Sequence, residues 1–423
     1  MILFYLLIAI MPLENHPIWQ KLLADVTVTK YLGLVCLLVA FVHLAQRHSV
    51  PHYFATAQFR WFLLFIALVS VNFVIKGADF EIQNSFLISY VSFLILMVIT
   101  ITIVDTLPRL YWCLATAAAS VAWASLYSIR EWVYGYHTWG AAFRPGWVVG
   151  DANYFGVNVV LCLPINFVLF IYAKKRWQRV FFLGCLPLTL LATTLGASRG
   201  GFLGLLVAFF YLVLHTTRKA RNIGVMLALL LPLLMFSPNS PVRRMFRSTY
   251  SDDQAARSRL VTWNIGLKMV AANPFLGVGL GRYKQVGPTY DSTGAFAIKP
   301  HIAHNAYLEI ASEMGLPALL VFLMVIATTF HTLKKVRRRA LAVGAEPLAN
   351  WTLGIESGLI GAVVALFFVS GQYQKMFWLM ISFSMCMPAL VPKWSAAKRE
   401  PPTQEQVNEE PGLQVGTALV EMR

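Results

Sequence analysis

Two arginines and a histidine are the residues of this 423-residue chain that best suit chemistry on an anionic group. Arg199 lies in the glycine-rich stretch GASRGG, Arg259 opens the stretch RLVTW, and His304 opens the stretch HNAYLE. The planar fork of a guanidinium matches phosphate oxygens, and a neutral imidazole can accept a proton from a hydroxyl. Such a set could hold a pyrophosphate while a base activates an acceptor hydroxyl.

Membrane helices are the elements that must position these residues. Hydrophobic residues make up 58% of the chain and charged residues only 13%, about half the charged share of a soluble domain. The apolar runs are continuous, which excludes soluble enzymes, secreted disulfide scaffolds and disordered regulators, and also a membrane β-barrel with its alternating pattern. Since a spanning helix takes about 20 apolar residues, we predict an all-α polytopic membrane protein with about twelve transmembrane helices. One large loop on the non-cytoplasmic side, containing short helices, completes this fold.

The apolar runs divide the chain into four parts. Transmembrane helices one to nine are predicted within residues 1–236, a large loop on the non-cytoplasmic side over 237–303, helices ten to twelve within 304–391, and a disordered cytoplasmic tail over 392–423. The N-terminal run has no basic region or cleavage site, so it is predicted to be a retained helix. The twelve runs are 1–12, 30–45, 60–75, 85–104, 108–129, 153–172, 179–195, 201–215, 222–236, 304–330, 351–370 and 374–391.

Positive charge predicts the orientation of these spans. An even number of spans places both termini on one side, and cytoplasmic loops collect lysine and arginine. Basic clusters at 174–179, 218–221 and 334–339 favour a cytoplasmic location for both ends. The loop 237–303 carries nine basic residues against three acidic ones, but long loops are translocated regardless of charge. Its positive surface would attract anionic lipid headgroups or bind an anionic substrate.

Arg199 is predicted at the tip of a helical hairpin. The apolar stretch 180–214 would be about 52 Å long as one helix, too long for a hydrocarbon core of about 30 Å. It must therefore fold back near the glycines, whose spacing also allows close helix packing. A guanidinium beside hydrocarbon is costly unless it faces a wet cavity or an anion; snorkelling to the interface is the alternative. Ser198 also completes a G-x-S-x-G pattern, but a hydrolase elbow needs a strand before it.

The loop 237–303 contains a predicted interfacial helix. Residues 259–272 place Leu260, Trp263, Leu267 and Val270 on one face, as in a helix that lies in the membrane interface. The helix should stop at Asn273-Pro274, where proline supplies no backbone donor. The next stretch, GVGLGRY, has neither the preceding strand nor the lysine of a nucleotide-binding loop, so we predict a flexible loop there.

His304 is predicted to begin the tenth span, where free N–H groups favour negative charge nearby. The alternative role is that of a hydrogen-bonded helix cap. His301 could assist it, while Glu309 and Glu313, one helical turn apart, predict a wetted helix face. Metal ligation by His301, His304 and Glu309 matches no strong signature, and the five cysteines lack metal or disulfide spacing. We therefore predict neither a metal nor another cofactor.

The stretch GDANYFG (150–156) adds Asp151 and Asn153. Both are common at helix starts, so capping is the ordinary interpretation; alternatively they hold a sugar hydroxyl or orient an arginine. With these two, the candidate substrate-binding residues are Arg257, His301, Asn305, Asp151, Asn153 and Glu309.

Three ordered stretches together resemble the bacterial O-antigen ligase and O-antigen polymerase superfamily. They are SRGGFLGL (198–205), RLVTW…NPFLGVGLGRY (259–283) and HNAYLEIASEMGLPALLVFL (304–323). GDANYFG is similar to the shorter Asp-x-Asn element of that family, although Ala152 stands where proline is common. The likeness covers roughly residues 150–330, and the first 145 residues match only in hydropathy.

The resemblance implies a metal-independent, inverting glycosyltransferase of the bacterial inner membrane with its active site facing the periplasm. Such enzymes take a glycan from undecaprenyl pyrophosphate, and the ligases join it to the lipid A–core oligosaccharide, without a nucleotide or nucleic acid. The family's catalytic residues would correspond to Arg199, Arg259 and His304, with Arg257 as the alternative loop arginine. A polymerase or a protein O-oligosaccharyltransferase, the two alternative enzymes, would use the same donor. A transporter of lipid-linked glycans is an alternative hypothesis outside the enzyme class.

Overall fold

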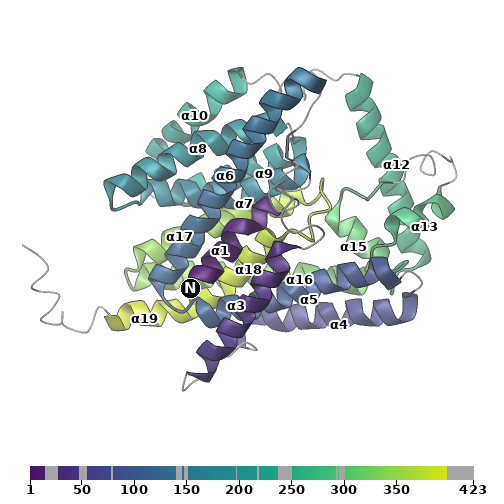
Figure 1. Cartoon of the computed structure of the whole chain (residues 1–423), viewed down its shortest axis with the longest axis horizontal. Coiled ribbons are helices and arrows are strands. Elements are labelled where there is room, and N and C mark those ends of the chain that lie inside the picture. Colours follow the sequence, from purple (N-terminus) through teal and green to yellow (C-terminus); the bar gives the residue numbers. More distant parts are fainter. Residues whose placement is uncertain are drawn as a thin grey trace, which may run out of the picture.

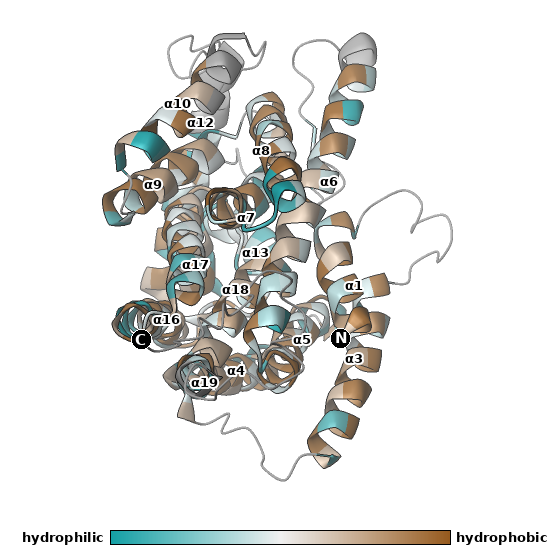
Figure 2. Cartoon of the chain, turned by 90° about the vertical axis from the view of Figure 1, so that its left-hand side faces the viewer, coloured by the Kyte–Doolittle hydropathy of each residue, from teal (hydrophilic) through white to brown (hydrophobic). Residues whose placement is uncertain are grey.

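The structure is a computed structural model that describes residues 1–14, 27–46, 55–77, 80–139, 145–146, 151–196, 198–216, 219–236, 250–291, 294 and 301–397. The described residues form helices and contain no strand. Nine of the described helical segments are long and apolar enough to cross a membrane, and hydrophobic residues predominate along the helices of the bundle (Figure 2). The chain is therefore a polytopic helical membrane protein, as its composition predicts, while the count of twelve spans stays a prediction.

The candidate spans leave a few shorter helices between them. The shorter helices are α1 (Ile2–Ile10) with the 3-10 turn η1 (Met11–Leu13), α9 (Arg199–His215), α13 (Tyr283–Tyr290) and α15 (Ala306–Met314). Two longer helices, α10 (Lys219–Phe236) and α12 (Tyr250–Ala272), are also not among the nine candidate spans. The spans are α3 (Val28–Ala45), α4 (Ala57–Lys76), α5 (Phe80–Ile103), α6 (Leu107–Trp139), α7 (Ala152–Ile171), α8 (Arg176–Gly196), α16 (Leu316–Ala342), α17 (Glu346–Ala365) and α18 (Lys375–Cys386), which continues toward α19 (Leu390–Ala397).

The predicted fold-back of the stretch 180–214 is confirmed, but its shape differs from a tight hairpin. Helix α8 ends at Gly196 and α9 begins at Arg199. Both helices pack on α7 rather than along each other, and α9 packs still more extensively on α17. Helix α7 is apolar on almost every side and is buried between them. Arg199 thus lies at the turn, at the start of a helix that faces α7 and α17.

The predicted tenth span is wrong as a single helix. It breaks at Gly315, which separates α15 from α16 and has a φ of 88°. Residues with a Cβ rarely adopt this backbone conformation, and a Cβ on Gly315 would overlap the carbonyl of Phe275. The predicted tail also starts too early, because α19 continues to Ala397; the rest of the tail lies outside the described residues.

Close packing between α9 and α17 rests on facing glycines. A Cβ on Gly204 would lie 2.5 Å from the carbonyl oxygen of Gly361 and 3.1 Å from the Cβ of Ala365. Small residues let membrane helices approach in this way, so the predicted role of the glycine spacing is confirmed at Gly204. It fixes the helix that carries Arg199 against α17.

Gly204→Ala should therefore destabilise the protein by about 2 kcal/mol, because the new methyl group must displace backbone. The matched control is Gly184→Ala in α8, where an added Cβ would meet nothing within 4 Å and alanine improves helix propensity. Thermal unfolding in one detergent checks both variants. Equal melting temperatures would contradict the close contact.

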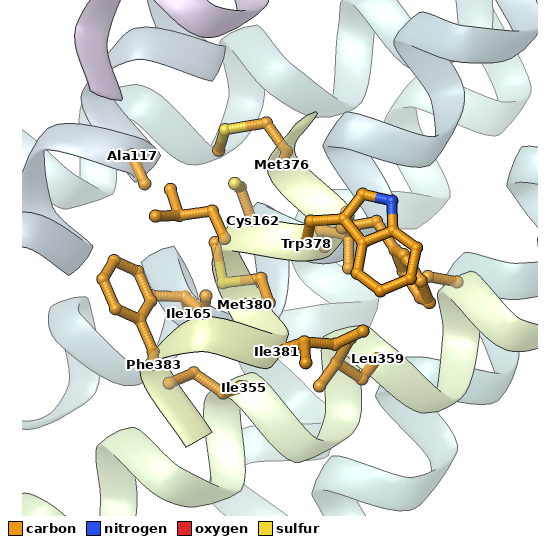
Figure 3. Packing of buried hydrophobic residues seen from close by; sticks show 14 of the residues in the cluster. Ala117, Cys162, Ile165, Ile355, Leu359, Met376, Trp378, Met380, Ile381 and Phe383 are labelled. Atoms are coloured by element: carbon orange, nitrogen blue, oxygen red, sulfur yellow. The ribbon is translucent and has the colours of Figure 1, made fainter. Parts of the chain in front are cut away.

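The interior of the bundle is apolar and tightly packed. Each of the five cysteines is buried as a thiol, which confirms the prediction that they are apolar filler. Figure 3 shows α18 in contact with α7 and α17. The side chains labelled there include Trp378, Met380, Ile381 and Phe383 of α18, Cys162 and Ile165 of α7, and Ile355 and Leu359 of α17.

The two ends of the bundle differ in character. Helices α12, α13 and α15 gather at one end, whereas α19 lies at the opposite end (Figure 1). Helix α7 starts beside Ser198 and its 20 residues extend about 30 Å. The basic cluster 174–179 that follows α7 therefore lies at the end away from α9's start.

Candidate active site at one end of the bundle

Arg199 and Arg259 line the same cavity. It has a volume of about 370 Å³ and lies between the first turn of α9, the middle of α12 and the segment that follows α17. Its lining consists of Arg199, Gly200, Leu203, Arg259, Leu260, Trp263 and Phe368. The two arginines, 60 positions apart in the sequence, thus meet beside apolar side chains, and both make further interactions.

A short chain of hydrogen bonds holds the start of α9. Asp151 caps α7 by accepting a hydrogen bond from the backbone of Asn153 at 2.7 Å, which confirms the capping interpretation. The side-chain oxygen of Asn153 accepts a hydrogen bond from the Ser198 hydroxyl at 3.1 Å. Ser198 in turn caps α9, where its hydroxyl accepts from the backbone of Gly201. The Ser198 hydroxyl is thus used to fix the helix that begins with Arg199.

Helix α12 presents two apolar faces. It ends at Ala272, before Asn273-Pro274, as predicted. The buried face carries Ile265 and Met269, which pack with Tyr283 of α13. Leu260 and Leu267 from the predicted face are 64% and 60% exposed, as expected for side chains that enter a membrane interface.

The arrangement of α12 also separates the two loop arginines. Positions two apart on a helix point about 200° from each other. Arg259 is half-buried and lines the cavity, whereas Arg257 is exposed and is not part of its lining. Of the two alternatives, Arg259 is the one the fold brings to Arg199.

The glycine-rich stretch 277–283 is firmly held, so the prediction of a flexible loop is wrong. Its backbone N–H groups at Gly281 and Tyr283 donate to the carboxylate of Glu313 at 3.0 and 3.1 Å. Asn72 of α4 adds hydrogen bonds to Leu280 and to the neighbouring backbone. Gly281 has a φ of 69°, and a Cβ there would overlap the ring of Phe86. The glycines therefore permit close packing on the bundle.

His304 lies just before α15 and does not cap it. The cap is Asn305, whose side-chain oxygen accepts from the backbone of Tyr307 and Leu308 at 3.1 Å each. This oxygen is thus engaged within the protein, and the substrate contact of Asn305 stays a prediction. His304 has a φ of 49° and is the one non-glycine residue in the described part of the chain with a positive value.

The surroundings of His304 keep its imidazole neutral. Burial, the largest cause, and the positive charge of Arg259 together lower its pKa from 6.5 to about 4. Asp151 acts in the opposite direction, while His301 and Lys284 add smaller lowering effects. Burial and a nearby cation both disfavour the positively charged imidazolium relative to the neutral imidazole. His304 can therefore accept a proton at neutral pH, and His301 and Asp151 belong to its surroundings.

The wetted helix face predicted at Glu309 and Glu313 is wrong, because both side chains are buried in protein. The Glu309 carboxylate accepts hydrogen bonds from the hydroxyl of Ser370, from the amide of Gln372 at 2.8 Å and from the backbone N–H of Ala303. Its oxygens are occupied by the protein itself. Glu309 thus connects α15 to the segment after α17.

That segment, residues 366–374, contains residues that sequence reasoning missed. Phe368 lines the arginine cavity and packs against Gly200, leaving no room for a Cβ there. Helix α17 ends at Ala365, so the predicted span 351–370 is too long. The polar run SGQYQ between two apolar runs was the available signal for a turn with its own contacts.

These features define a polytopic membrane protein with a cationic cavity and a neutral histidine at one end of its bundle. Residues 184–323 match the family profile described as O-antigen ligase. The resemblance to the O-antigen ligase superfamily, a family of membrane glycosyltransferase-like ligases and polymerases, is therefore confirmed over this third of the chain. The matched segment contains Arg199, Arg259 and His304, while Asp151 and Asn153 precede it. No curated protein matches the chain.

Proposed function

We propose that this protein is an O-antigen ligase. It would transfer a glycan from undecaprenyl pyrophosphate to a hydroxyl of the lipid A–core oligosaccharide, with inversion and without a metal, at the periplasmic face of the inner membrane. The observation that carries the proposal is the meeting of Arg199 and Arg259 in one cavity within the family segment.

The composition of the cavity supports an amphiphilic donor. Two guanidiniums suit the pyrophosphate, whose negative charge they can neutralise through paired hydrogen bonds. Leu203, Leu260 and Phe368 line the same cavity, and Leu260 is largely exposed. Apolar surface therefore begins where the phosphates would end, as a polyprenyl chain requires.

The transfer step assigns one task to each of the three residues. The acceptor oxygen attacks the anomeric carbon from the face opposite the pyrophosphate, which inverts the configuration. The bond from that carbon to the phosphate oxygen breaks, and the electron pair leaves with undecaprenyl pyrophosphate. Arg199 and Arg259 stabilise the growing negative charge, while His304 takes the proton of the acceptor hydroxyl.

The distribution of basic residues supports the periplasmic placement. The cluster 174–179 follows the end of α7 that points away from the cavity. The cluster 334–339 lies in the last turns of α16, whose first turn follows α15. Cytoplasmic ends of spans collect lysine and arginine, so the cavity would face the opposite side, with both termini in the cytoplasm.

A reconstituted transfer assay tests the proposal. The purified protein receives a matched lipid-linked glycan with or without lipid A–core. A ligase forms a glycan–lipid A–core product only when the acceptor is present. A ladder of longer lipid-linked glycans without the acceptor would indicate a polymerase instead, and glycosylation of an added protein acceptor would indicate a protein O-oligosaccharyltransferase. Absence of every product with active substrates would contradict the proposal.

The pH dependence of transfer should follow the unusual pKa of His304. Its neutral form is the proposed base, and a pKa of about 4 keeps that form dominant at every pH above this value. We expect kcat/KM to stay level from about pH 8 to pH 5 and to fall below that range, because kcat/KM reports the unliganded enzyme. A fall centred near pH 6.5, the value of an exposed histidine, would contradict the buried position.

A further inference from the structure

The residue before His304 is held from both sides. The backbone N–H of Ala303 donates to the carboxylate of Glu309, and its carbonyl accepts from the indole N–H of Trp263 at 2.9 Å. Ala303 is fully buried, so these two side chains supply partners that water would supply elsewhere. Trp263 belongs to α12 and Glu309 to α15, so the backbone of Ala303 joins two separate helices.

The conformation of His304 explains why such restraint is needed. A φ of 49° lies in the left-handed region, which is unfavourable for a residue with a Cβ. Residues keep such values only where their surroundings fix them. On the following side, Asn305 is fixed by its two cap hydrogen bonds. His304 therefore lies between two immobilised neighbours.

The same two side chains connect His304 to both walls of the cavity. Trp263 lines the cavity one helical turn after Arg259. Glu309 also holds Ser370 and Gln372, which follow Phe368 on the opposite wall. A change in either side chain would shift His304 relative to the arginines.

We propose that Trp263 and Glu309 are positioning residues that clamp the backbone of Ala303 on both sides of its Cα and thereby fix the imidazole of His304 beside Arg259. The effect on transfer rests on the function proposed above, whereas the placement of His304 does not. Neither side chain needs to touch the reacting atoms. Their role is to keep the base within reach of the acceptor held at the cavity.

The first experiment measures the placement directly. Trp263→Phe removes the indole N–H and retains an aromatic ring in the cavity wall. The titration of His304 is followed by NMR of carbon-13-labelled histidine, and its signal is identified by its loss in His304→Gln. We expect the pKa of His304 to rise from about 4 toward 6.5, because a loosened imidazole gains water and moves away from Arg259.

The other charged groups around His304 stay the same in this comparison. Arg259, Lys284 and His301 lower its pKa and Asp151 raises it, and Trp263→Phe changes none of them. The matched control is Trp123→Phe on α6, where the tryptophan is 60% exposed; it should leave the His304 titration unchanged. Glu309→Gln, which leaves one acceptor oxygen for three donors, should shift the titration in the same direction and provides the test if Trp263→Phe does not fold.

The second experiment measures transfer. In both variants kcat should fall by about tenfold or more, because a small displacement of a reacting group is costly. KM for the lipid-linked donor should stay within about twofold, since the arginines that bind it remain in place. An unchanged His304 titration in both variants, or a loss that appears only in KM, would overturn the proposal. If the wild-type protein transfers no glycan, the proposed function fails, while the NMR titration still decides the clamp.

Discussion

Arg259→Lys should reduce glycan transfer by about 10²–10³-fold, the usual cost of removing one stabilising donor from a site of developing charge. Lysine keeps the positive charge but loses the planar fork that binds two phosphate oxygens at once. The loss should appear in kcat/KM measured with the lipid-linked donor. A variant that retains wild-type transfer would show that Arg259 does not hold the departing pyrophosphate.

Arg257→Lys is the matched control for this variant. It makes the same chemical change two residues earlier on α12, at an exposed side chain outside the cavity lining. Transfer should stay within about twofold of the wild type, because exposed charges act weakly through water. Equal losses at both positions would indicate a general effect of positive charge on this helix rather than a defined phosphate contact.

His304→Ala should reduce transfer by about 10²–10⁴-fold, the range expected when a general base is removed. Binding of the donor should change little, because the two arginines remain. The measurement is single-turnover transfer with saturating donor, which separates chemistry from binding. His301→Ala is the control, since His301 is nearby but half-exposed and contributes only a minor effect to the pKa of His304.

Removal of the base should also change the response to pH. In His304→Ala the residual transfer should lose the fall below about pH 5, because the group that titrates with a pKa of about 4 is absent. A variant that keeps both its rate and its acid limb would contradict the assignment of His304 as the base. Loss of donor binding along with transfer would instead point to a collapse of the cavity.

The sequence predicts the helical membrane fold because hydropathy and length are local properties of each run. It also predicts the turn at Arg199, since no bilayer can accommodate a single helix over 180–214. The break at Gly315 was missed although Pro317 follows it, because proline is also common in the first turn of a helix and the apolar run continues beyond it. Only the close approach of the Phe275 carbonyl explains why glycine and a positive φ are required there.

The candidate site, like the fold, could be predicted from the sequence only in part. Glycine patterns and basic residues identify Arg199 and Arg259, but no sequence pattern shows that they share a cavity. The carboxylates of Glu309 and Glu313 were expected in water because a buried acid needs partners. Those partners are Ser370 and Gln372 for one and the loop backbone for the other, and they lie far away in the sequence or belong to the main chain.

The hydrogen bonds of Asn72 have a consequence for protein engineering. This asparagine lies in the N-terminal region, which resembles the family only in hydropathy, yet its amide holds the backbone of the loop between α12 and α13 at Leu276 and Leu280. A chimaera that takes its first helices from a relative would therefore lose the hydrogen bonds to this loop unless the relative also has an asparagine or glutamine at this position. The first 145 residues, although they resemble the family only in hydropathy, are in this respect specific to the loop that they hold and cannot be exchanged freely.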